Sequence, residues 1–137
     1  MFVMIGIFVV IFMSWKTTPY LKEVEFVPSW LSRWGDLPQN NQIRTAVPFM
    51  GLGFLCGIYL RFSKRTFFSY WAMAWLGLIM IVCIAELGQY YIPSRQLDFM
   101  DVFWGMVGSG FGLGLAFFVM QALLFFKSHY RERKKRN

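Results

Sequence analysis

Five strongly polar residues stand between two long apolar stretches of the chain: Glu86, Gln89, Arg95, Asp98 and Asp101. At a membrane boundary each of them costs desolvation free energy unless it has a partner or stays hydrated. Three carboxylates, an amide and a guanidinium can form ion pairs, hold a polar headgroup or coordinate a hard cation. We take these five residues, called the polar cluster below, as the candidate functional site.

The spacing of the polar cluster predicts how two helices present it. Glu86 and Gln89 are three residues apart, so they share a face if the helix before them continues for one more turn. Asp98 and Asp101 fall at the start of the next apolar stretch, where exposed N–H groups and the helix dipole favour acidic side chains. Arg95 lies just upstream and is expected to reach Glu86 or either aspartate.

The elements that position the cluster are membrane-spanning helices. The chain has 137 residues, of which 57% are hydrophobic, 20% aromatic and only 15% charged, unlike a soluble domain. Residues 66–85 carry no charge, and about twenty such residues cross a hydrocarbon layer of about 30 Å. We predict an all-α membrane protein, an antiparallel bundle of four transmembrane helices over about 2–18, 45–61, 66–89 and 98–126, forming one domain from 1 to 126.

Two segments before the second helix leave alternatives open. Residues 1–15 are apolar but short, and a cleaved signal peptide competes with a first transmembrane helix. The missing basic start and the missing small-residue cleavage site favour the helix. In 16–44, Trp30, Leu31 and Trp34 share one helical face and Gly35 follows, which predicts a short amphipathic helix in the membrane interface. An ordinary loop with aromatic anchors is the other interpretation.

Glycines at helical spacing predict where helices pack closely. Gly53 and Gly57 form a small-xxx-small pair in the second helix, and Gly105, Gly108 and Gly112 follow Asp98 and Asp101 along one stripe of the fourth. Such spacing is typical of a packing groove and does not require a ligand.

Charge asymmetry predicts the topology. The 61–65 turn carries +3 and residues 127–137 carry +5 (six basic, one acidic), whereas 16–44 carries +1 (four basic, three acidic) and 86–101 carries −2 (one basic, three acidic). Four helices place the two basic segments on one side, and the positive-inside rule makes that side cytoplasmic. Both termini are then cytoplasmic, and the polar cluster faces outward. The basic tail is expected to be partly disordered and to contact anionic lipids, not nucleic acid.

Around the polar cluster the chain resembles the VanZ-like family of small bacterial membrane proteins, named for a teicoplanin-resistance protein. The family pattern of Glu, two residues, Gln, a short turn with Pro-x-Arg, and then Asp is met by Glu86, Gln89, Pro93, Arg95 and Asp101. The resemblance covers roughly residues 43 to 120. It implies a helical protein of the bacterial cell envelope, in the bacterial inner (plasma) membrane, with a link to glycopeptide resistance.

The chain departs from that family at two positions. Gly105 stands where the family usually has Asn, and Thr45 stands near a position where many members carry His. The only histidine, His129, lies in the basic tail, so no His/Cys metal constellation exists. Cys56 and Cys83 fall inside apolar stretches, where free thiols are expected.

Four functions remain open for the polar cluster and the chain around it. The cluster could lock two helices together, or bind an envelope amphiphile such as a lipid headgroup or a glycopeptide-like molecule. It could also bind a cation or support catalysis, although Arg95 among the carboxylates and the lack of a nucleophile–base pair argue against this. The chain as a whole could be an accessory subunit of a larger membrane complex. We predict a non-catalytic protein without a cofactor.

Overall fold

The computed structural model describes residues 2–15, 20, 22, 27–37, 40, 43–92 and 98–136, and of residues 2, 128 and 130–136 only the backbone. All elements in these ranges are helical, as the sequence predicts. They are α1 (Phe2–Ser14), α2 (Ser29–Gly35), the 3-10 turn η3 (Ile43–Thr45), α3 (Ala46–Phe62), α4 (Phe68–Gln89) and α5 (Phe99–Arg136).

Three of the helical segments are long and apolar enough to cross a membrane: Ile43–Phe62, Phe68–Gln89 and Phe99–Lys127. The bounds of α3 and α4 lie within two residues of the prediction, and Pro48 sits in the first turn of α3, where its missing N–H costs nothing. The first helix is shorter than expected. It ends at Ser14, not near residue 18, so its 13 residues extend only about 20 Å.

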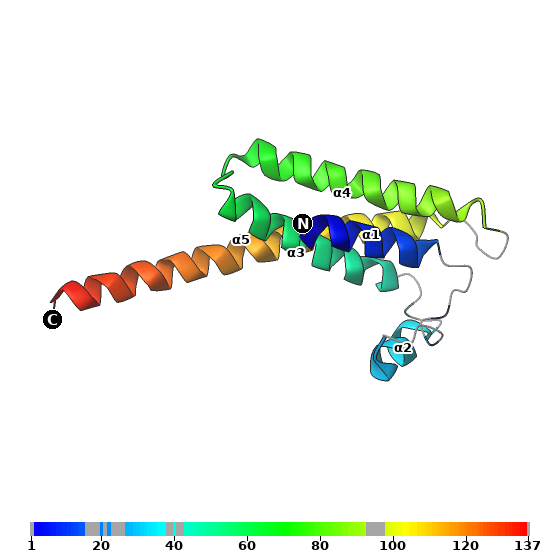
Figure 1. Ribbon diagram of the computed structural model, residues 1–137, viewed down its shortest axis with the longest axis horizontal. Helices are drawn as coiled ribbons and strands as arrows, with labels where there is room; N and C mark the ends of the chain where they lie inside the picture. The colour runs from blue at the N-terminus through cyan, green and yellow to red at the C-terminus, as the bar shows by residue number, and fades with distance from the viewer. Residues whose placement is uncertain are drawn as a thin grey trace.

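The long helices do not pack simply in sequence order (Figure 1). Although α3 and α4 touch, the main partner of α3 is α5, which runs parallel to it. The helix α4 runs antiparallel to both, and α1 lies against α3 and α4. The α3–α4 turn lies at one end of the bundle, and α4 ends and α5 begins at the other.

Small residues explain why α3 prefers α5. A Cβ added at Gly53 would overlap the Ser109 carbonyl oxygen, one at Gly108 would overlap that of Ala46, and one at Gly112 would overlap that of Met50. The two backbones therefore touch directly, as in small-xxx-small helix pairs. Gly105 is different, because its missing side chain admits Val82 of α4, whose methyl carbons lie 2.9 Å from the added Cβ. The predicted glycines thus lie in two interfaces, not in one groove.

The α3–α4 turn has a defined backbone. Lys64 adopts φ 56°, and the Arg65 N–H donates to the Leu60 carbonyl at 2.9 Å, closing α3 in a Schellman-type end. The Arg65 guanidinium lies over the Tyr70 ring, 4.8 Å from its centroid, and the Arg65 carbonyl accepts a hydrogen bond from Trp71 Nε1 at 3.2 Å. These contacts attach the turn to the end of α3 and to the start of α4.

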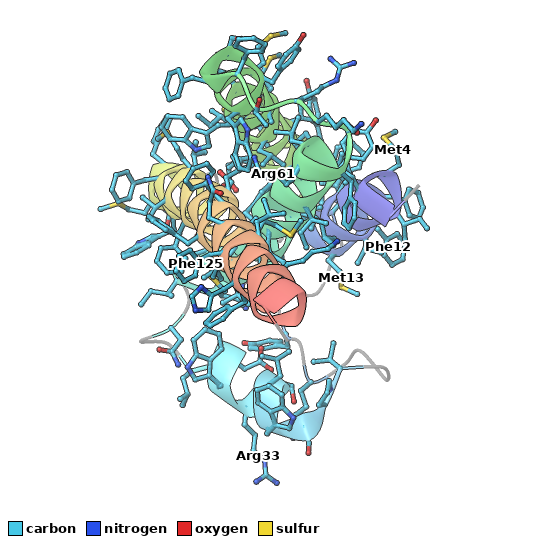
Figure 2. The ribbon with its side chains drawn as sticks, turned by 90° about the vertical axis from the view of Figure 1, so that its left-hand side faces the viewer. Met4, Phe12, Met13, Arg33, Arg61 and Phe125 are labelled. Atoms are coloured by element: carbon cyan, nitrogen blue, oxygen red, sulfur yellow. The ribbon has the colours of Figure 1, made fainter. Side chains whose placement is uncertain are left out.

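The last helix is longer than the sequence suggested. We expected it to end near residue 126, before a partly disordered tail, but α5 continues to Arg136. Arg61 at the end of α3 donates from Nη2 to Gln121 Oε1 at 3.4 Å, and beyond this level α5 projects alone (Figure 1). Figure 2 looks along this projecting end and shows Phe125 on its surface.

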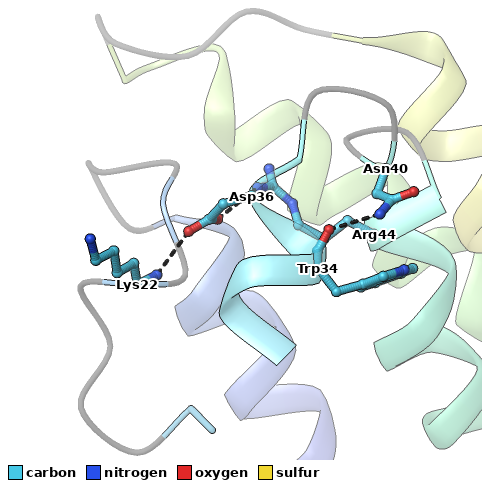
Figure 3. Close-up of polar contacts among 5 residues, drawn as sticks. All are labelled: Lys22, Trp34, Asp36, Asn40 and Arg44. Carbon is cyan, nitrogen blue, oxygen red and sulfur yellow. Dashed lines mark hydrogen bonds and ion pairs between the residues drawn. The ribbon is translucent and has the colours of Figure 1, made fainter. Parts of the chain in front are cut away.

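The predicted short helix between the first two apolar segments is present as α2, beside the bundle at the end where α5 begins (Figure 1). Trp30 on α2 is 70% exposed. Asp36 ties the segment together: its Oδ2 accepts the Lys22 N–H at 3.0 Å, and its Oδ1 lies 3.9 Å from Arg44 Nη1 (Figure 3). Asn40 also donates to the Trp34 carbonyl, at 2.8 Å.

Candidate functional site

Glu86 is the centre of the site. It lies in the last turn of α4 and is only 4% exposed. Its Oε1 accepts the backbone N–H of Asp98 at 2.7 Å, and its Oε2 accepts Gln89 Nε2 at 3.1 Å. Asp98 directly precedes α5, so the side chain of one helix binds an N–H at the start of another. Negative charge is favoured at this helix end.

Gln89 extends the site to α1. Besides its bond to Glu86, its Nε2 donates to Ser14 Oγ at 2.9 Å. Ser14 Oγ in turn donates to the Ala85 carbonyl at 3.3 Å, and Trp15 Nε1 donates to the same carbonyl at 3.1 Å. The ends of α1 and α4 and the start of α5 are therefore joined by side-chain hydrogen bonds.

Gly88 leaves the space that the Trp15 indole occupies. A Cβ added at Gly88 would overlap the indole nitrogen and would lie 2.7 Å from Cζ2. A larger residue there would push Trp15 away and break its bond to Ala85. Gly88 therefore allows Trp15 to approach α4 closely, although it forms no part of the predicted glycine stripe.

The two aspartates occupy different positions at the start of α5. Asp98 Oδ1 accepts the Met100 N–H at 2.8 Å, which is the hydrogen bond of a helix N-cap, and Asp98 is half-buried. Asp101 is in the first turn, its N–H donates to the Asp98 carbonyl at 3.0 Å, and one of its carboxylate oxygens is buried. Asp98 thus stabilises the helix start with its side chain and meets Glu86 with its backbone.

Replacing Asp98 tests this capping role. Asp98→Ala should lower the free energy of unfolding by about 1 kcal/mol, because the Met100 N–H loses its acceptor. Asp98→Asn keeps an acceptor and should cost only a few tenths of a kcal/mol, the loss of the charge at the helix dipole. Unfolding of the detergent-solubilised protein, followed by circular dichroism, would measure both. Equal losses would show that the charge, not the cap, is what counts.

The structure brings most of the predicted polar cluster together. Glu86, Gln89 and Asp98 are linked by hydrogen bonds, and Asp101 lies one turn further along. The expected partner Arg95 falls in residues 93–97, outside the described part of the chain.

Sequence reasoning missed Ser14 and Trp15. Both stand at the end of the first apolar stretch, which the predicted topology places at the same membrane surface as Glu86. Their predicted position at the same membrane surface as Glu86 could have identified Ser14 and Trp15 as members of the site.

A second polar contact lies within the bundle and was also missed. The Met106 carbonyl accepts hydrogen bonds from Trp75 Nε1 at 3.2 Å and from Ser109 Oγ at 2.9 Å, and Ser109 is fully buried. Gly110 makes room for the indole, whose nitrogen would lie 3.1 Å from an added Cβ. This contact ties the middle of α4 to α5.

Within the described residues, no group of three or more His, Cys, Asp or Glu side chains is placed to hold a metal ion. The three apolar helices of spanning length indicate a membrane protein. Comparison of the chain with protein-family models, curated proteins and solved structures found no match.

Proposed function

We propose that this chain is a non-catalytic integral membrane protein of the bacterial cell envelope, VanZ-like in organisation, whose polar cluster locks α1, α4 and α5 together at the outward-facing end. The supporting observation is the state of Glu86, buried with both carboxylate oxygens accepting hydrogen bonds from the chain itself. A carboxylate engaged in this way fixes the meeting point of helices. Glu86, Gln89 and Asp101 are also residues of the VanZ-like pattern.

The surface beside the lock suits an amphiphilic ligand. Tyr90, Tyr91, Phe99 and Met100 are exposed around the half-buried Asp98. Aromatic side chains at this level can lie against acyl chains while a carboxylate contacts a polar headgroup. We therefore assign this surface, called the amphiphile rim below, to an envelope amphiphile. A lipid-bearing glycopeptide is the candidate that the family resemblance suggests.

Teicoplanin binding to the protein in lipid nanodiscs tests this function. The intact antibiotic should bind more tightly than the same glycopeptide without its acyl chain. Tyr91→Ala and Phe99→Ala should weaken binding, while Phe111→Ala, an exposed residue further along α5, should not. The melting temperature should be unchanged in all three variants. Equal binding by the rim variants and the control would contradict the assignment.

The proposed topology has four membrane segments and cytoplasmic termini. It is supported by the basic α3–α4 turn and the C-terminal end of α5 lying at the same end of the bundle. Reporter fusions at residue 40 and after residue 130 should report opposite compartments. The same compartment for both would remove the four-segment arrangement and the outward placement of the polar cluster.

A second candidate function is an accessory subunit of a larger membrane complex. It is favoured by α5, which continues alone past the other helices with Leu123, Leu124, Phe125 and Phe126 exposed. Purification from native membranes in mild detergent would show a stoichiometric companion if this function holds. A protein that runs alone would leave the envelope function as the better account.

A further inference from the structure

The α3–α4 turn concentrates positive charge. Arg61, Lys64 and Arg65 stand within five residues, called the basic turn below (61–65), and the sequence holds no Asp or Glu between 37 and 85. All three cations lie at the end of the bundle opposite Glu86, and Lys127 of α5 follows Gln121, the contact of Arg61, by six residues. A surface of this charge attracts an anion.

The basic turn is also preorganised. The positive φ of Lys64 and the Arg65 to Leu60 hydrogen bond fix its backbone, and the Trp71 indole holds the Arg65 carbonyl. The Arg65 guanidinium rests on the Tyr70 ring, while Arg61 is held beside α5 by Gln121. A guanidinium has five N–H donors, so these contacts orient both groups and still permit binding to phosphate oxygens.

Exposed aromatic side chains flank the cations. Phe62 and Phe67 are each 75% exposed and Phe68 is 85% exposed. Above them, Trp71 of α4 and Phe117 of α5 meet edge to face, with ring centroids 5.7 Å apart. A headgroup at the turn would therefore have apolar side chains on the side of the bundle where its acyl chains run.

From this combination we propose that the basic turn is a binding site for the phosphate headgroup of an anionic phospholipid. Arg61, Lys64 and Arg65 hold the phosphate, and the acyl chains lie along the aromatic side chains of α4 and α5. This site is separate from the amphiphile rim, since it lies at the other end of the bundle and does not depend on Glu86. It also differs from the C-terminal basic tail, where lipid contact was expected from charge alone.

Native mass spectrometry of the delipidated full-length protein tests the proposal. Phosphatidylglycerol, phosphatidylcholine with the same acyl chains, and inorganic phosphate would be titrated separately. We expect tight binding of phosphatidylglycerol, at least about tenfold weaker binding of phosphatidylcholine, and no competition by millimolar phosphate. The double variant Arg61→Gln/Arg65→Gln should bind phosphatidylglycerol at least about tenfold more weakly, given the contribution of each cation near an anionic headgroup.

The matched control also removes two positive charges, but elsewhere in the chain. Lys134→Gln/Lys135→Gln in the tail should leave the tight phosphatidylglycerol site intact. Equal binding of the two lipids by the wild-type protein would overturn the proposal even if the turn variant failed to fold. It would also be overturned if only the tail variant lost binding or if phosphate alone displaced the lipid.

Discussion

Gly112→Ala should destabilise the protein by about 3 kcal/mol, because the closest helix pair has no room for one methyl group. The added Cβ would overlap the Met50 carbonyl oxygen and would lie 2.8 Å from the Phe54 nitrogen. Both atoms belong to the backbone of α3, so no side-chain rotation can relieve the overlap. The helices α3 and α5 would have to separate along their whole contact.

Gly114→Ala is the matched control for this variant. Gly114 lies two residues further along α5, and an added Cβ there meets nothing within 4 Å. Its replacement should be neutral or slightly stabilising, since alanine favours a helix over glycine by up to about 1 kcal/mol. Chemical unfolding in mixed micelles would compare the two variants. Similar losses at both positions would show that α3 and α5 do not pack as described.

Glu86→Ala should cost about 2–6 kcal/mol, because two buried donors lose their acceptor and each such loss costs about 1–3 kcal/mol. The Asp98 N–H and the Gln89 amide would lose their acceptor in a site that water reaches poorly. Gln89→Ala should cost less, because the carboxylate keeps the N–H at the start of α5. The double variant should cost less than the sum of the two single changes, because the Glu86–Gln89 bond is lost only once.

Unfolding free energies of the wild type, both single variants and the double variant give this coupling energy. Gln121→Ala, which removes an exposed hydrogen bond to Arg61, serves as a control and should change stability by no more than about 0.5 kcal/mol. Additive effects of Glu86→Ala and Gln89→Ala would show that these side chains do not share a network. The lock proposed for this end of the bundle would then have to be abandoned.

Local pattern predicted much of the fold. Charge-free stretches of the right length gave α3 and α4 to within two residues, and the Trp30, Leu31 and Trp34 face with Gly35 gave α2. The end of α5 could not be predicted from polarity, because Lys, Arg and Glu are good helix formers and no Gly or Pro interrupts residues 127–136. A polar tail ends the apolar stretch without ending the helix.

The candidate site was also predictable only in part from the sequence. The three-residue spacing of Glu86 and Gln89 predicted their common face, and the position of Asp98 predicted a helix start. The bond between Gln89 and Ser14 spans 75 residues, and only the packing of α1 on α4 brings these groups together. No periodicity in the sequence contains that information. The same holds for the pairing of α3 with α5, since glycine spacing shows that a close partner exists but not which helix it is.

The length of α5 has a consequence for the bilayer itself. Its apolar segment Phe99–Lys127 extends about 43 Å, whereas Ile43–Phe62 extends about 30 Å, close to the thickness of an average hydrocarbon layer. Because α3 and α5 are in backbone contact, α5 cannot tilt alone to correct this hydrophobic mismatch. The bundle must tilt as a body, or the bilayer must thicken beside α5 and not beside α3. The protein should therefore favour thicker membranes and deform thin ones asymmetrically.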